Sequence, residues 1–299
     1  MLLLDSASLY YRSFFALPES ITSPSGQPVN AVRGFLDTVA ALARDRGPSA
    51  IVACWDDDWR PRWRVDLIPT YKTHRVLDET DDTEVTPDAL APQVDMLREI
   101  LPALGIPVVG REGAEADDVI ADLSATHRGP VDIASGDRDL VQLVSDRVTL
   151  LFTGGTSASR GGKPWLVLTP ELAEQRYGVP PAHYADLAVL RGDPSDGLPG
   201  VKGIGEKTAA ALVREFGGLE AILSAAADTA SPRPMTPALR SRLLESAEEI
   251  RRAERVVRLS PDPSAVAKPA ASADAAEVDR LAAEWGVSAA ATRLRESLR

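Results

Sequence analysis

The sequence has almost no cysteine, little histidine and no long apolar run. Cys54 is the only cysteine among 299 residues, so an intramolecular disulfide and a cysteine-based zinc site are both excluded. The three histidines (His74, His127, His183) lack H-x-x-x-H spacing, which weighs against zinc. No stretch of about eighteen apolar residues exists, so no membrane span is predicted. The apolar start, MLLLD, is too short for a signal peptide, and we expect a cytoplasmic protein.

The net charge of −11 argues at first against a polyanionic partner, but the charges are unevenly distributed. Residues 59–75 form a basic strip in which one acid, Asp66, stands against Arg60, Arg62, Arg64, Lys72 and Arg75. Acids gather elsewhere, for example in DETDDTE at 78–84. A basic strip and an acidic cluster on one chain could serve nucleic acid together with metal. Solvated surface charge explains the strip equally well when it is taken alone.

Apolar runs alternate with helical patterns along the first half of the chain. The predicted strands lie at 1–5, 50–56, 130–137 and 147–152. The helical patterns lie at 31–47, 90–105 and 115–127. This alternation predicts an α/β fold with a mostly parallel sheet and helices on both faces. Ligands bind beyond the carboxyl ends of such strands, which places Asp5, Asp56 and Asp137 at one rim.

The pattern changes after about residue 168. Helix-like segments separated by Gly and Pro follow, so we expect a first domain at 1–168 and a helical domain at 169–260. Residues 260–277 are poor in large apolar side chains and are typical of a linker. One last helix is expected at 277–298, within a terminal region of 261–299.

Nine carboxylates stand at strand ends, helix starts and turns. Each has an ordinary explanation alone, as a helix cap, a helix-terminal charge or a turn residue. Together at one rim they could not all be ionised without cations, and Mg²⁺ or Mn²⁺ suits such oxygen ligands. Two ions could stabilise an in-line phosphoryl displacement between them. The candidates are Asp5, Asp56, Glu115, Asp117, Asp118, Asp137, Asp139, Asp193 and Asp196.

A glycine-rich loop precedes a helix near residue 205. Gly200, Gly203 and Gly205 let a backbone approach a phosphate at a helix N-terminus. The G-K-[ST] order of a Walker A loop is absent. The loop has the form of a helix-hairpin-helix element, which grips a nucleic-acid backbone without reading sequence. An ordinary interhelical turn is the alternative.

Five stretches of the sequence closely resemble the 5′-nuclease (flap endonuclease) family, best the 5′-nuclease domain at the N-terminus of bacterial DNA polymerase I. They are LLLDSASLYYRSFFALP, YKTHR, GAEADDVIADL, SGDRDLVQLV and LRGDPSDGLPGVKGIGEKTAAALV, and the resemblance covers about residues 1–260. It implies a PIN-like (resolvase-type) core, a helical arch at about 71–92 and a helical domain with a helix-three-turn-helix DNA-binding motif at about 197–218. We expect a stand-alone, monomeric member of the family.

The resemblance implies Mg²⁺- or Mn²⁺-dependent cleavage of DNA at 5′ flaps, 5′ ends and single-strand/double-strand junctions in replication and repair. RNA of RNA–DNA hybrids is a further expected partner, K⁺ is expected at the hairpin, and the expected location is the nucleoid. Asp5, Asp56, Glu115, Asp117 and Asp118 would serve the first metal ion. The second would take Asp137, Asp139, Asp193 and Asp196, with Asp117 or Asp118 near both.

The same resemblance carries over catalytic and DNA-binding positions. Arg12 and Lys72 would be catalytic. DNA contacts would come from Tyr11, Tyr71, Arg75, Gly200, Val201, Lys202, Gly203, Ile204, Gly205, Lys207 and Thr208. The chain departs from the family pattern at Gly197, where Asn is usual, at Arg138, where Lys is usual, and at Trp59 and Trp63. These tryptophans could stack on unpaired bases or pack beneath the arch.

Three alternatives remain open. A DNA-binding protein with a silent site would bind flaps without cutting them. A PIN-type ribonuclease would not require the glycine hairpin. A D-x-D phosphatase is disfavoured, because Gly136 precedes DRD where that chemistry expects an apolar strand residue.

Overall fold

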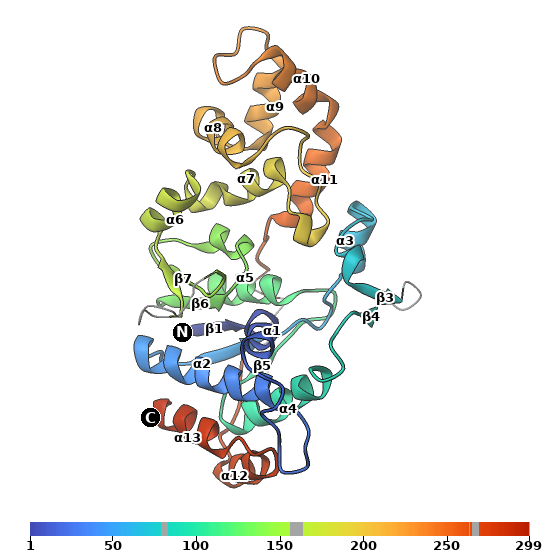
Figure 1. Ribbon diagram of the computed structural model, residues 1–299. Helices are drawn as coiled ribbons and strands as arrows, with labels where there is room; N and C mark the ends of the chain where they lie inside the picture. The colour runs from blue at the N-terminus through green and yellow to red at the C-terminus, as the bar shows by residue number, and fades with distance from the viewer. Residues whose placement is uncertain (79–82, 156–163, 263, 265–268, 299) are drawn as a thin grey trace.

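The computed structural model describes the chain except residues 79–82, 156–163, 263, 265–268 and 299 (Figure 1). A six-stranded sheet has the order β5-β2-β1-β6-β7-β8, and all neighbours are parallel except β7 and β8. The strands are β1 Leu2–Asp5, β2 Ile51–Cys54, β5 Val108–Val109, β6 Val131–Ser135, β7 Val148–Phe152 and β8 Leu166–Leu168. The four predicted strands are confirmed, whereas β5 and β8 were not anticipated.

Both faces of the sheet are buried, as its parallel strands require. Along β1, Leu2 and Leu4 pack into one hydrophobic cluster and Leu3 into the other. The first cluster lies under α1, α2 and α4, and the second under α5 and the helical domain. These helices are α1 Ser6–Ala16, α2 Asn30–Arg46, α4 Ala91–Ala103 and α5 Ala116–Thr126. The α/β prediction is therefore confirmed.

The chain beyond residue 168 is helical, as predicted. Thr169 caps the first of these helices by accepting a hydrogen bond from Leu172 N, and Pro170 occupies its first turn. The domain stands above the sheet in Figure 1. Its helices are α6 Pro170–Tyr177, α7 Tyr184–Arg191, α8 Glu206–Phe216, α9 Leu219–Ala227, α10 Pro237–Glu245 and α11 Ala247–Val257, with short 3-10 turns η3 Pro181–His183 and η4 Pro194–Asp196.

The C-terminal region contains two helices where one was expected at 277–298. They are α12 Ala275–Glu284 and α13 Ser288–Ser297, separated at Gly286, whose φ is +70°. They return to the first domain, where α13 packs on α2 and α12 on α4 (Figure 1). Arg293 of α13 bonds Asp37 of α2 at 2.7 Å. The expected linker is thus shorter, since α12 begins at Ala275.

The expected helical arch at 71–92 is not helical among its described residues before α4, and 79–82 lie outside them. Its described residues form a 3-10 turn and a pair of antiparallel strands instead. Its β-branched residues and Pro87 disfavour a helix. The elements here are α3 Arg62–Leu67, η1 Thr73–Arg75, η2 Asp139–Leu143, β3 Val76–Asp78 and β4 Thr83–Glu84. In the part of the chain that is described, no helix is long and apolar enough to cross a bilayer.

Candidate active site

Three predicted acids meet at the carboxyl edge of the sheet. Asp5 ends β1 and caps α1, because its Oδ1 accepts a hydrogen bond from Ser8 N at 3.1 Å. Asp56 and Asp137 each follow a strand that pairs with β1 in parallel. All three line one cavity of 230 Å³. The common rim expected from strand direction is therefore present.

Seven of the nine predicted acids border two adjoining cavities, which we call the acidic cleft. The first cavity also takes Glu115 and Asp117 from the start of α5. The second, of 20 Å³, adds Asp139 and Asp196 and shares Lys72, Glu115, Asp117 and Asp137 with the first. Asp117 thus borders both cavities, as do Glu115 and Asp137.

Asp118 and Asp193 do not line the cleft. Asp118 forms a capping box at the start of α5, accepting a hydrogen bond from Glu115 N at 3.1 Å. Its two oxygens bind the Arg64 guanidinium at 2.8 and 2.9 Å. Asp193 caps η4 and binds Arg138 at 3.0 Å. Each of these carboxylates therefore forms an ion pair with an arginine. The spacing of the residues along the sequence does not indicate these pairs.

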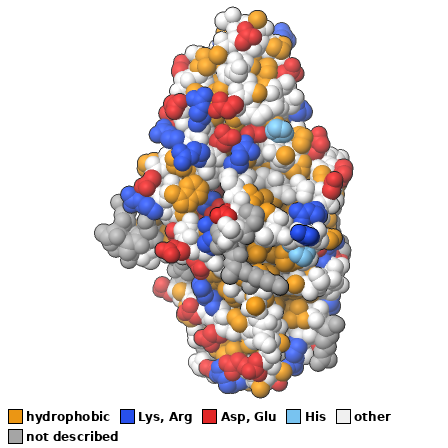
Figure 2. Space-filling model, turned by 180° about the vertical axis from the view of Figure 1, so that it is seen from behind, with side chains coloured by type: hydrophobic (Ala, Val, Ile, Leu, Met, Phe, Trp, Pro, Cys, Tyr) orange, Lys and Arg blue, Asp and Glu red, His pale blue; other side chains and the backbone are white. Residues whose placement is uncertain are grey.

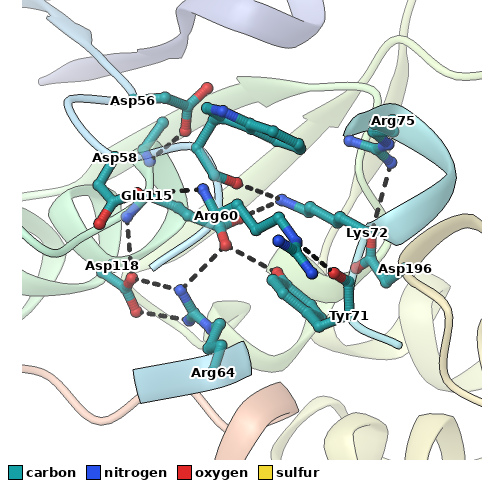
Figure 3. A network of polar contacts seen from close by, with 12 residues as sticks. Asp56, Asp58, Arg60, Arg64, Tyr71, Lys72, Arg75, Glu115, Asp118 and Asp196 are labelled. Carbon is teal, nitrogen blue, oxygen red and sulfur yellow. Dashed lines mark hydrogen bonds and ion pairs between the residues drawn. The ribbon is translucent and has the colours of Figure 1, made fainter. Parts of the chain in front are cut away.

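Cations from the basic strip reach into the cleft (Figure 3). Lys72 Nζ donates to Glu115 Oε2 and to the carbonyl of Trp59. The Tyr71 hydroxyl donates to Glu115 Oε1 at 2.8 Å. Arg75 lies 3.3 Å from Asp196 Oδ1. The basic strip therefore neutralises part of the acidic cluster, a role that sequence reasoning missed.

Tyr71 and Arg12 differ in how they lie relative to the cleft. Tyr71 is buried, with 4% of its surface exposed; it borders the second cavity of the cleft and binds Glu115 through its hydroxyl. Arg12 is not among the residues that line either part of the cleft, whereas Tyr11, its neighbour on α1, is. Helix periodicity explains this, because adjacent residues on a helix point in different directions.

Burial raises the pKa of several carboxyls despite these cations. The pKa of Asp5 rises to about 7 through burial and the charges of Asp56 and Asp137, although the Ser135 hydroxyl opposes the shift. Burial and neighbouring carboxylates, partly offset by Lys72, raise the pKa of Asp196 to about 6. The pKa values of Asp117 and Asp139 lie well above normal for the same reasons. The cleft has more buried negative charge than its lysine and arginines offset.

The chemistry of the cleft suits hard divalent cations. Its free ligands are carboxylate oxygens, and Asp139 Oδ1 is buried with no hydrogen-bond partner among the described residues. Within the same described ranges, no three acidic, histidine or cysteine side chains form a ready-made ligand set. Lys72 forms an ion pair with Glu115, and Arg75 forms one with Asp196, so these two carboxylates already have cationic partners. The residues therefore fit a cation that would compete with these two side chains.

The glycine loop between α7 and α8 is anchored by two apolar side chains and leaves its lysines at the surface. Gly200 and Gly203 have φ of +63° and +77°, which only glycine adopts readily. Val201 and Ile204 are 3% exposed and anchor the loop in the core. At its outer side Gly205 N-caps α8, Thr208 is half-buried, and Lys202, Gly203, Gly205 and Lys207 are exposed.

Arg242 of α10 is a cation at this loop that the sequence did not indicate. A Cβ on Gly203 would lie 2.5 Å from an Arg242 terminal nitrogen. No motif signals it, because the two residues come from separate helical segments.

Gly197, a departure from the family pattern, has a structural reason here. Its φ is +73°, and a Cβ would lie 2.0 Å from the carbonyl oxygen of Thr70. The Thr70 hydroxyl donates to Gly197 O at 2.9 Å, and Lys72 N donates to Asp196 O at 3.0 Å. The glycine thus lets the 70–72 segment pack against the Asp196 turn, which fixes Asp196 beside Lys72.

The chain matches two protein-family models. Residues 1–178 match the 5′-3′ exonuclease N-terminal resolvase-like domain, and residues 179–280 match the 5′-3′ exonuclease C-terminal SAM fold. A 5′-3′ exonuclease of Streptomyces coelicolor is 50% identical over 99% of both chains. One of Mycobacterium tuberculosis is 45% identical over 100% of this chain and 97% of the relative. DNA polymerase I of Mycobacterium bovis is 42% identical over 75% of this chain and 24% of the polymerase.

Solved structures share the fold at low sequence identity. The bacteriophage T5 D15 flap endonuclease, in a pseudo-enzyme-product complex with DNA and metal ions, has a TM-score of 0.62 at 20% identity. That similarity covers 99% of this chain and 98% of the phage protein. Flap endonuclease-1 from Methanococcus jannaschii has a TM-score of 0.61 at 14% identity, covering 99% and 92%. At these identities the likeness concerns the arrangement of the chain.

Proposed function

Because the chain belongs to the 5′-3′ exonuclease family and is a structure-specific 5′ nuclease, we propose that its substrates are DNA 5′ flaps, 5′ ends and single-strand/double-strand junctions. The observation that carries this proposal is the placement of seven carboxylates in one cleft, with the exposed glycine hairpin in the adjoining domain. Phosphodiester hydrolysis at a junction needs a site for divalent cations and a surface that binds the DNA backbone independently of sequence. The cleft and the glycine loop would supply these two parts.

We propose that divalent cations, Mg²⁺ or Mn²⁺, occupy the two halves of the cleft. Asp5, Asp56, Glu115 and Asp117 would hold one, and Asp137, Asp139 and Asp196 the other, with Asp117 shared. Such cations lower the pKa of a bound water and stabilise a departing oxygen. Asp118 and Asp193 would support these sets through Arg64 and Arg138.

The protein's own side chains would position the scissile phosphate. Lys72 and Arg75 lie at the edge of the cleft, where they could exchange their carboxylate partners for phosphate oxygens. Arg12 of α1 would help to position the phosphate. Tyr11 of the same helix would contact the DNA strand at the rim of the cleft.

The loop from Gly200 to Gly205 would hold the duplex backbone, through K⁺ as well as through its own amides. Lys202 and Lys207 would add sequence-independent attraction to phosphates. We further propose a monomer working in the cytoplasm at the nucleoid, with RNA strands of hybrids as a second substrate.

The deciding experiment uses a labelled double-flap DNA with Mn²⁺, mapping the cut position. Asp137→Ala and Asp139→Ala should abolish cleavage yet retain flap binding, whereas Asp146→Asn, an exposed control, should cut normally. Binding without cleavage in the unaltered protein would support a silent junction-binding protein instead. Faster cutting of an RNA flap than of a DNA flap would favour a PIN-type ribonuclease. Full activity of either alanine variant would remove the assignment of the second cation.

A further inference from the structure

A separate cavity lies next to the acidic cleft, beyond the Arg64–Asp118 ion pair. Arg64 borders the acidic cleft, and its ion-pair partner Asp118 borders the separate cavity. Its volume is 470 Å³, within the range of about 300–1,000 Å³ that small-molecule sites occupy. We call it the back pocket and define it by Trp63, Arg111, Gly113, Asp118, Arg255 and Arg258. Of its residues, Asp118 alone has a role in the function proposed above, as a support of the cation sets through Arg64.

Trp63 gives the back pocket a fixed aromatic surface. Its side chain belongs to α3 and the residue remains 40% exposed, which is unusual for so large an apolar group. The indole N–H donates to the carbonyl of Gly113 at 3.2 Å. The Arg64 guanidinium carbon lies 4.5 Å from the ring centroid, and Arg64 is itself held by Asp118. The ring is therefore oriented in advance and still accessible.

The charges around Trp63 leave one arginine available. Asp118 is paired with Arg64, Glu254 with Arg258 at 2.9 Å, and Arg111 with Asp122 at 3.3 Å. Arg255, on the exposed side of α11, forms no hydrogen bond or ion pair within the described ranges.

Figure 2 shows Lys and Arg side chains, interspersed with Asp and Glu, over the helical domain on the face turned away from the viewer in Figure 1. Asp262 also borders the pocket, where its Oδ1 accepts hydrogen bonds from Ser264 N and Ser264 Oγ. Arg111 and Arg258 are paired with carboxylates, so within the described ranges an anion entering the pocket would pair with Arg255.

We propose that the back pocket binds a nucleotide, with its base stacked on Trp63 and its phosphate paired with Arg255. Stacking on an aromatic ring accepts every base, and an arginine recognises phosphate with two donors. The nucleotide is either the free product of 5′ digestion or one unit of a single strand. This inference extends beyond the proposed cleavage, because binding here needs no divalent cation and breaks no bond.

The test measures equilibrium binding in EDTA, so that the result does not depend on cleavage. Titration calorimetry measures the binding of three probes: 2′-deoxyadenosine 5′-monophosphate, deoxyadenosine, and a single strand of four deoxyadenosine nucleotides. Trp63→Ala should weaken binding by about five- to a hundredfold, while Trp63→Phe, which keeps a ring, should stay within about threefold. Arg255→Gln should weaken the phosphorylated probes by about tenfold and leave deoxyadenosine unchanged.

Arg252→Gln is the matched control on α11. Arg252 lies three residues earlier, borders a different cavity and pairs with Glu249, so its loss should not alter binding. Thermal unfolding of each variant checks that the fold is intact. Binding of the strand without the mononucleotide would identify a strand subsite, and binding of both would identify a product site. Absence of binding by either, or equal binding by Trp63→Ala and the unaltered protein, would overturn the proposal even if flap cleavage were normal.

Discussion

Lys72 donates a hydrogen bond from its ammonium group to Glu115 in the acidic cleft. Its φ is +50°, and it is the single non-glycine residue with positive φ in the described part of the chain. Backbone amides and carbonyls hold this conformation, since Lys72 N donates to Asp196 O. Although burial alone would lower the pKa of Lys72, the charges of Glu115, Asp196 and Asp56 raise it. A strained backbone thus keeps a charged lysine among the carboxylates.

Lys72→Met should lower the single-turnover rate of flap cleavage by about a hundred- to a thousandfold, because a preorganised cation beside the phosphate would be lost. Flap affinity, measured by fluorescence anisotropy with Ca²⁺ in place of Mg²⁺, should change little. Lys72→Arg keeps the charge and should retain part of the rate. A rate for Lys72→Met within twofold of the unaltered protein would exclude a catalytic role.

Strand direction is what made much of the site predictable. Asp5, Asp56 and Asp137 follow apolar runs, and the carboxyl ends of parallel strands share one edge, so their convergence follows from the sequence. Helix α5 was also predictable, because Glu115 stands before a segment in which apolar residues recur at helical spacing as far as Leu123.

Side-chain pairing across the fold was not predictable. Arg64 and Asp118 are separated by 54 residues, and no periodicity distinguishes an arginine that binds a buried acid from one in solvent. The strand β5 has only two residues, too few to show an alternating pattern. The residues of β3 and β4 were assigned to a helical arch by resemblance, and since only Val76 and Thr83 among them are β-branched, their composition does not indicate the strand pair that forms.

Stability without metal should fall as the pH rises from about 4 to about 7. Asp5, with a folded pKa of about 7 and an ordinary value of 3.8, keeps its proton in the folded state after the unfolded chain has released it. Asp196 behaves similarly up to about 6. The free energy of unfolding should therefore fall by about 1.4 kcal/mol per pH unit for each group while both conditions hold, and level off above the folded pKa.

Saturating Mn²⁺ should reduce or reverse this slope, because a bound cation favours the ionised carboxylates. Urea unfolding across this pH range, with EDTA or with Mn²⁺, measures both effects. Asp5→Asn should flatten the metal-free slope between about 6 and 7. A metal-free protein that became more stable over this pH range would contradict the assignment of buried, protonated carboxyls.

Lys202→Gln should weaken duplex binding and reduce its salt dependence. Lys202 is exposed at the glycine hairpin, where each phosphate contact contributes about 0.9 to the slope of log K against log salt concentration. The slope should therefore become shallower by about one, without a change in cut position. Arg44→Gln, at an exposed position on α2, is the control and should keep the original slope. Identical slopes for the two variants would place the duplex elsewhere.

Two buried arginines should respond oppositely to replacement by methionine. Arg64 has 4% of its side chain exposed and forms two short bonds to Asp118, so Arg64→Met should cost about 3–5 kcal/mol by leaving Asp118 without its cationic partner. Arg191 has 12% exposed, yet its Nη1 and Nη2 have no hydrogen-bond partner among the described residues. Its nearest carboxylates, Asp193 and Glu206, are 3.5 and 3.7 Å away.

Arg191→Met should consequently remain within about 1 kcal/mol of the unaltered protein or stabilise it, since the desolvation cost of the guanidinium is offset only by the bond from Nε to Gly192 O and by two long ion pairs among the described residues. Urea unfolding of both variants in EDTA provides the comparison. A loss for Arg191→Met as large as that for Arg64→Met would mean that the guanidinium has partners, such as buried water, that bind it to Asp139 and Tyr184. In that case both arginines would be structural supports of the acidic cleft.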